Sequence, residues 1–131
     1  MNASYGFSIG YLMPDPETDK VEDHQGGGNT SLWSENMLLA IDYQTGKIRW
    51  SHDLGDGASG AGVLTTESGL TFSGDTAGNA LALRTSDGTT LWHAGIGRVG
   101  NGPITYELDG RQYVLIGGGS ALYAWALPQN P

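Results

Sequence analysis

The stretches AIDYQTGKIRW (residues 40–50) and ALRTSDGTTLW (residues 82–92) show how the chain is organised. Ala40, Gly46 and Trp50 each have an identical counterpart 42 residues later, and a third copy begins at Ala124. A fixed period of about 40–45 residues is typical of the blades of a β-propeller. The repeat therefore predicts an all-β chain built from propeller blades.

Composition excludes several classes of protein. The chain has 131 residues, enough for one domain, and 14 acidic against 6 basic residues give a net charge of -8. Nucleic acids and anionic membrane surfaces require a basic surface, so neither is an expected partner. The absence of cysteine rules out disulfides and thiolate metal sites. No apolar run is long enough to span a membrane, and residues 1–14 lack the basic start and long apolar centre of a signal peptide.

Short runs with β-like patterning, separated by turn residues, begin at Met37. No segment sustains a helical period, so few helices are expected. Residues 1–35 are interpreted as an irregular loop with the remnant of a preceding blade, and residues 36–131 as propeller blades. Within them, 36–54 is the end of one blade, 62–95 a complete four-stranded antiparallel blade, and 102–127 three strands of the last. Strands are predicted at 37–42, 47–51, 62–66, 70–74, 80–84, 91–95, 103–108, 111–117 and 121–127.

The repeated residues have a physical role in such a fold. Thr45-Gly46 is expected to turn the chain between the two outer strands of a blade, since glycine tolerates positive φ. Trp50 and its counterpart Trp92 offer a large apolar surface and one N–H donor, and each is expected to dock between adjacent blades. The second copy has Arg84 and Asp87 where the first has Asp and Thr, which predicts a weaker turn.

These residues also resemble a known family. Ala-x-Asp-x-x-Thr-Gly-x-x-x-Trp, complete at 40–50, is similar to the tryptophan-docking motif of eight-bladed quinoprotein propellers. The segments GVLTTESGLTFSGDTAGNALAL and LWHAGIGRVGNGPITYELDGRQYVLIGGG resemble the C-terminal end of pyrroloquinoline quinone (PQQ) dependent alcohol dehydrogenases. The similarity runs from about Gly26 to Pro128. The fold it implies is a partial propeller, with about two to three blades of an eight-bladed ring.

The resemblance implies a periplasmic parent enzyme that oxidises an alcohol or sugar by hydride transfer to PQQ, with Ca²⁺ bound nearby. It assigns the catalytic Asp, the Ca²⁺ ligands and an adjacent cysteine pair to earlier blades, so no catalytic or metal-binding residue is assigned here and the isolated chain is expected to be inactive. Two glycine-rich loops are candidates to line the cofactor, with Gly60 and Ala61 in one and Gly118 and Gly119 in the other. Glycine required for tight inner turns is the alternative explanation of these loops.

A different class of function stays open at this point. The docking motif also occurs in cofactor-free propeller scaffolds that bind other proteins, such as the lipoprotein of outer-membrane assembly. The segment PITYELDGRQYV (residues 103–114) favours the enzyme. His24, His52 and His93 lack metal-ligand spacing, and the acidic run 15–23 lacks the order of a calcium-binding loop.

The third unit ends at residue 127 without an outer strand, a strand that in the resembled enzymes comes from the N-terminus of the same chain. Residues 1–13 of this chain also fit an inner strand of the first partial unit, so they are not expected to supply it. The remaining blades of the parent are therefore expected partners. The strand 121–127 is expected to be an open edge with Tyr123 or Trp125 exposed, and open edges favour self-association.

Overall fold

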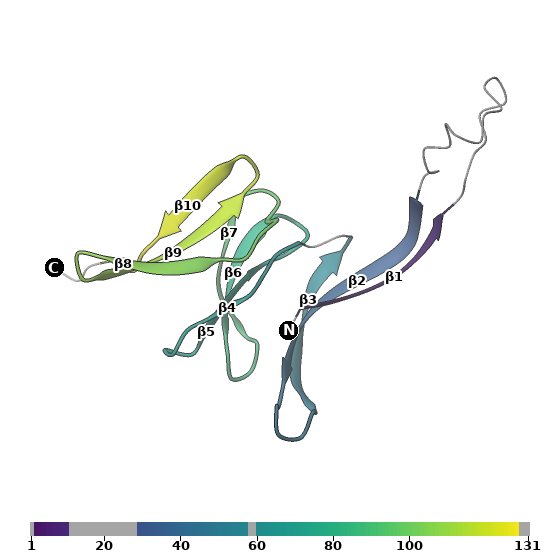
Figure 1. Ribbon diagram of the computed structural model, residues 1–131, viewed down its shortest axis with the longest axis horizontal. Coiled ribbons are helices and arrows are strands. Elements are labelled where there is room, and N and C mark those ends of the chain that lie inside the picture. The colour runs from purple at the N-terminus through teal and green to yellow at the C-terminus, as the bar shows by residue number, and fades with distance from the viewer. Residues whose placement is uncertain (1, 11–28, 58–59, 129–131) are drawn as a thin grey trace, which may run out of the picture.

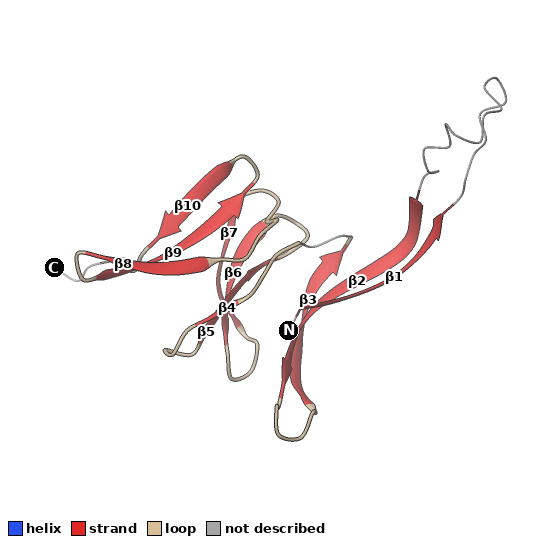
Figure 2. Ribbon diagram, in the orientation of Figure 1, coloured by secondary structure: helices blue, strands red, loops and turns tan. Residues whose placement is uncertain are grey.

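A computed structural model describes residues 2–10, 29–57 and 60–128, with 2–10 and 29–33 described through their backbone. These residues form ten strands and, within the described part, no helix that could span a membrane (Figure 2). The strands are β1 (Asn2–Gly10), β2 (Asn29–Ile41), β3 (Ile48–Asp56), β4 (Leu64–Thr65), β5 (Leu70–Gly74), β6 (Asn79–Arg84), β7 (Thr90–Gly95), β8 (Ile104–Leu108), β9 (Arg111–Gly118) and β10 (Ala121–Trp125).

The strands form three antiparallel sheets, each made from consecutive strands. Sheet A has the order β1-β2-β3, sheet B the order β4-β5-β6-β7, and sheet C the order β10-β9-β8. The sheets follow one another from sheet A to sheet C (Figure 1). This arrangement confirms the predicted all-β partial propeller, in which each sheet packs face to face on the next.

The sequence repeat is visible in the strand pairing. Ala40 lies directly opposite Trp50, and Ala82 lies directly opposite Trp92. The register shifts immediately after each alanine, at Ala40/Ile41 in sheet A and at Ala82/Leu83 in sheet B. A small alanine beside a large indole leaves the ring room to tilt, and each bulge increases the local twist. The two copies therefore build the same corner of two successive sheets.

The turns after these alanines share one backbone geometry and differ in their side chains. In the first turn, Gly46 N–H donates to the Asp42 carbonyl at 2.7 Å, and Asp42 Oδ1 accepts from the N–H groups of Gln44 and Thr45. In the second, Gly88 N–H donates to the Arg84 carbonyl at 2.8 Å.

Asp87 replaces the missing aspartate of the second turn. Its Oδ1 accepts from Thr89 N–H, and its Oδ2 lies 2.9 Å from Arg84 Nη1 in an exposed ion pair. The substitutions that predicted a weaker turn therefore supply a different set of hydrogen bonds to the same backbone.

The turn between β8 and β9 is the two-residue hairpin that Asp-Gly predicts. Both residues have positive φ, 53° at Asp109 and 71° at Gly110. Positive φ at both positions is the requirement of a type I′ turn, which matches the right-handed twist of the strands. The turn sets Tyr106 opposite Tyr113, and their rings stack with centroids 5.2 Å apart.

Sheets A and B meet through a leucine core closed by Trp50. Leu38 and Leu54 of sheet A pack with Leu81 and Leu83 of sheet B, and Trp50 lies against them. The Trp50 indole N–H donates to the Thr85 carbonyl of sheet B at 2.9 Å. A Cβ on Gly88 would lie 2.6 Å from Trp50 Cε3, so the ring rests on this glycine. The predicted docking of Trp50 between blades is confirmed.

Sheets B and C meet through a second core with a different tryptophan contact. Ala80, Ile96, Val99 and Ile116 are buried there, and Trp92, Val114, Tyr123 and Trp125 pack against them. The Trp92 and Trp125 rings meet edge to face with centroids 4.8 Å apart. Trp92 thus lies between two sheets, as predicted, but its partner is an aromatic ring and not a turn.

Some predicted details were wrong. The strand predicted from Met37 begins at Asn29, because residues 29–38 pair with β1. Residues 2–10 and 29–35 are strands of sheet A, and β1 agrees with the inner strand expected within residues 1–13. Residues 11–28 lie outside the described part. Tyr123 and Trp125 are half-buried against the core and not exposed. The large exposed side chain of β10, which is an edge strand of sheet C, is Leu122.

Candidate functional site

The loops of the described sheets divide between two ends, because antiparallel strands reverse direction at every turn. The turns 42–47, 66–69, 85–88 and 109–110 lie at one end. The segments that connect successive sheets, 57–63 and 96–103, lie at the other end with the β5–β6 and β9–β10 turns (Figure 1). We call this second end the connection end. All four candidate cofactor-lining residues are there.

Gly60 and Ala61 lie in the connection between sheets A and B. A Cβ on Gly60 would lie 3.4 Å from the Gly100 carbonyl oxygen, in the next connection. A Cβ on nearby Gly62 would lie 2.6 Å from Gly102 Cα, so the two connections touch backbone to backbone. Ala61 is only 5% exposed and belongs to the core between sheets B and C. Gly60 itself is exposed.

Gly118 and Gly119 lie at the turn between β9 and β10. Gly118 is buried, and a Cβ added to it would clash with the carbonyl and the side chain of Ile96. Gly119 is exposed and has a φ of 56°, and its N–H donates to the Arg98 carbonyl at 3.0 Å. Close approach and positive φ are both conditions that glycine meets without strain.

The structure thus brings both candidate loops against one segment, residues 96–102, which sequence reasoning had not singled out. A signal was present, because this segment stands one repeat length after residues 54–60, which end β3 and begin the connection between sheets A and B. Val99 is 2% exposed and anchors the segment, since a Cβ on Gly74 would overlap its side chain. Segment 96–102 therefore holds the two glycine loops in place.

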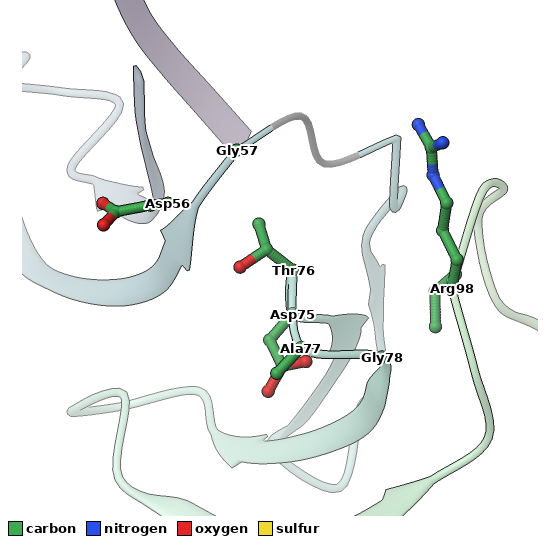
Figure 3. A pocket seen from close by; sticks show the side chains of 8 residues that line it. Asp56, Gly57, Asp75, Thr76, Ala77, Gly78 and Arg98 are labelled. Carbon is green, nitrogen blue, oxygen red and sulfur yellow. The ribbon is translucent and has the colours of Figure 1, made fainter. Parts of the chain in front are cut away.

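A polar hollow of about 320 Å³ opens at the connection end between sheets A and B. Its lining includes Asp56, Asp75, Thr76 and Arg98, with Asp56 and Arg98 on opposite sides (Figure 3). Asp75 is already satisfied, because its Oδ1 accepts from Asn79 N–H and its Oδ2 from Asn79 Nδ2, both at 2.7 Å. The other ionisable side chains of the lining are Asp56 and Arg98, which carry opposite charges.

Thr76 fixes the geometry of this hollow. Its N–H and its Oγ1 both donate to the Leu54 carbonyl, at 2.8 Å and 2.9 Å. Leu54 belongs to sheet A and Thr76 to the β5–β6 turn of sheet B, so this contact joins the sheets at the connection end. Trp50 joins the same two sheets at the other end.

A second groove, of about 450 Å³, separates β3 from sheet B and is lined by His52, Asp53, Asp75 and His93 among others. The described residues contain no group of three or more His, Asp or Glu side chains placed to hold a metal ion. The groove therefore supports no metal assignment.

The perturbed carboxylates lie at the opposite end of the sheets. The backbone N–H groups of Thr45 and Gln44 lower the pKa of Asp42. The backbone and side chain of Thr89, followed by Arg84, lower the pKa of Asp87 to about 2. Both groups are turn caps held in their charged form, so neither is suited to proton transfer near neutral pH.

Comparison with known proteins decides the family. A family model described as the glucose/ethanol/alcohol dehydrogenase beta-propeller domain, PQQ, matches residues 33–114. The chain belongs to this family. The match spans parts of all three sheets and the docked Trp50, so the PQQ-family propeller is the fold on which the site must be judged.

Curated relatives of this PQQ-family chain are much longer proteins. Quinoprotein alcohol dehydrogenase PedH from Pseudomonas putida is 39% identical over 93 residues, which are 68% of this chain and 15% of the relative. Quinoprotein ethanol dehydrogenase from Pseudomonas putida is 38% identical over 108 residues, 79% of this chain and 15% of the relative. The chain therefore spans about 15% of the length of these relatives.

Solved structures agree with the PQQ-family fold. Quinohemoprotein alcohol dehydrogenase from Comamonas testosteroni superposes with a TM-score of 0.60 at 29% identity, covering 76% of this chain and 14% of that one. BamB from Moraxella catarrhalis superposes with a TM-score of 0.51 at 19% identity, covering 79% of this chain and 38% of that one. The likeness to BamB shows the fold alone.

The four candidate residues differ in how accessible they are. Ala61 and Gly118 are buried in contacts between neighbouring segments, and none of the four carries a polar side chain. Gly60 and Gly119 are exposed at the connection end and offer only backbone.

Proposed function

We propose that this chain is a propeller segment of a PQQ-dependent dehydrogenase that oxidises an alcohol or a sugar by hydride transfer to PQQ, with Ca²⁺ as a second cofactor. The observation that carries the proposal is the family match over residues 33–114, which covers parts of all three sheets and includes Trp50, the residue that joins sheets A and B. The relatives include alcohol, ethanol and glucose dehydrogenases, so both substrate classes are retained in the proposal.

The role of this segment in such an enzyme is to hold sheets in place and not to do chemistry. No catalytic residue is assigned to it, and its perturbed carboxylates are turn caps at the end away from the candidate loops. Gly60 and Gly119, the exposed pair among the four candidates, are the positions proposed to lie along the cofactor in the complete ring. The parent is proposed to be periplasmic.

A segment-exchange experiment tests the proposal. The aligned segment of Pseudomonas putida quinoprotein ethanol dehydrogenase is replaced by the aligned residues of this chain, with the matching segment of BamB as the control. We expect the first chimera to retain bound PQQ and PQQ-dependent ethanol oxidation, and the control to lose both. A chimera that folds, as judged by circular dichroism, but retains no PQQ would contradict the proposal.

The 131-residue chain alone is expected to be inactive and to bind PQQ weakly or not at all, because its candidate residues offer backbone groups only. Calorimetric titration of the chain with PQQ in the presence of Ca²⁺ measures this directly. Saturable binding with a dissociation constant below a micromolar would show that the segment carries a complete site.

A further inference from the structure

The described residues leave an apolar face of sheet C uncovered. Val114, Ile116, Tyr123 and Trp125 face sheet B. Side chains alternate between the faces of a strand, so the neighbouring positions point away from sheet B. They include Ile104 at 56% exposure, Tyr106 at 39%, Leu108 at 56% and Leu122 at 69%. Strand register places them on one face, which we call the outer face of sheet C.

Within the described residues, the opposite side of sheet A is buried at Leu39, which is 7% exposed, and open beside the β2–β3 turn. Leu38 and Trp50 point toward sheet B, so Ile41 and its strand partner Ile48 point away from it. Ile41 is 42% exposed and Ile48 is 59% exposed. Among the described residues other than its two chain neighbours, none has an atom within 4 Å of the place that a Cβ on Gly46, in the adjoining turn, would take. We call this the outer face of sheet A.

The repeat shows that these two faces are the halves of one kind of interface. Leu122 stands two repeat lengths after Leu38, and Ile41 stands one repeat length before Leu83. Leu38 is 1% exposed and Leu83 is 0% exposed, and both lie in the core that joins sheets A and B. The outer face of sheet C is therefore equivalent to the face of sheet A that packs on sheet B. The outer face of sheet A is equivalent to the face of sheet B that packs on sheet A.

We propose that the chain associates head to tail, with the outer face of sheet C of one copy packed on the outer face of sheet A of a second copy. The contact continues the stacking already seen from sheet A to sheet B, with Leu122 of one copy against Ile41 of the next. It joins two different surfaces, so each added copy presents a further free face, and assembly grows until the arrangement closes on itself. This inference goes beyond the proposed function and does not depend on cofactor binding.

Two single variants and their mixture test the proposal. Ile41→Lys damages only the outer face of sheet A, and Leu122→Lys only the outer face of sheet C. Both positions are exposed, so the folded sheets should be retained, which circular dichroism checks. In sedimentation velocity the unmodified chain should be oligomeric and increase in size with concentration, whereas each variant alone should be a monomer. An equimolar mixture should form a 1:1 dimer and nothing larger, because one intact face of each kind remains.

Leu91→Lys is the matched control. Leu91 is 47% exposed and stands one repeat length after Arg49. The equivalent position in the first copy of the sequence repeat therefore already carries a cation. This variant should sediment like the unmodified chain. The proposal is overturned if the unmodified chain is a monomer over the whole concentration range, if either face variant leaves the oligomer intact, or if the mixture of the two variants stays monomeric.

Discussion

Replacing Gly88 by alanine tests whether the docked tryptophan holds sheets A and B together. Gly88 has a φ of 76°, where alanine costs about 1–2 kcal/mol. Its new Cβ would also lie 2.6 Å from Trp50 Cε3, so the indole has to move. Moving it breaks the 2.9 Å bond to the Thr85 carbonyl, worth about 1 kcal/mol, and removes packing of similar worth. Gly88→Ala should destabilise the chain by about 3–4 kcal/mol.

Gly46→Ala is the internal control for backbone strain. Gly46 occupies the equivalent turn with a φ of 68°, and nothing lies within 4 Å of the place of its Cβ. Gly46→Ala should therefore lower the free energy of unfolding only by the cost of alanine at positive φ, about 1–2 kcal/mol. Free energies of unfolding from urea titrations followed by circular dichroism give both values. The background is Ile41→Lys with Leu122→Lys, which removes any contribution of association.

The decisive quantity is the difference between the two glycine variants, expected to be about 2 kcal/mol. In a Trp50→Ala background this difference should disappear, because there is no ring left for the new methyl group to displace. Equal costs at the two glycines, or a difference that persists without the indole, would refute the docking argument.

Three further predictions follow from single contacts. Thr76→Val removes one of two hydrogen bonds to the Leu54 carbonyl and should cost about 1 kcal/mol in urea unfolding, while Thr76→Ser should cost less; equal losses would contradict the contact. Trp92→Ala should lower the free energy of unfolding by about 3 kcal/mol in the same assay, which is the lower end of the range for removing a large aromatic side chain, because the Trp92 ring is half-buried. A loss near zero would contradict packing of Trp92 between the sheets. The pKa of Asp87 is lowered from 3.8 to about 2, first by the backbone of Thr89. The ionised carboxylate should therefore stabilise the fold fully above the ordinary pKa of 3.8, and this contribution should be lost as the pH falls toward 2. A midpoint near 3.8 in an NMR titration of the Asp87 carboxyl carbon would contradict this.

Much of the fold was predictable because the information is local. Alternating apolar residues and turn pairs such as Asp109-Gly110 fix strands and hairpins within a few residues of sequence. The start of β2 was not predictable in this way. Asn29 to Ser34 contains few strand-forming residues, and it becomes strand by pairing with β1 across a long intervening segment. Such pairing depends on tertiary context, which overrides local preference.

The repeat predicted equivalent positions but not equivalent partners. Trp50 donates to the Thr85 carbonyl, and one repeat length later the corresponding acceptor for Trp92 is the carbonyl of Leu127. That carbonyl accepts from Arg111 Nη2 at 2.7 Å instead. Trp92 packs against Trp125, which stands one repeat length after the smaller, aliphatic Leu83. The aromatic contact therefore arises from a substitution in the third copy, outside the motif that identified Trp92.

The candidate cofactor loops show why glycine alone is an ambiguous signal. Gly118 stands one repeat length after Thr76, and Ile96 one repeat length after Leu54. Between sheets A and B, Thr76 reaches the Leu54 carbonyl with its N–H and hydroxyl. Between sheets B and C, the place of a Cβ on Gly118 is bounded by the Ile96 carbonyl. The same pair of positions thus joins each pair of sheets, by hydrogen bonds in one case and by close backbone approach in the other. A buried glycine in this fold is accounted for by the neighbouring sheet, and only an exposed one, such as Gly60 or Gly119, has surface left to meet a ligand.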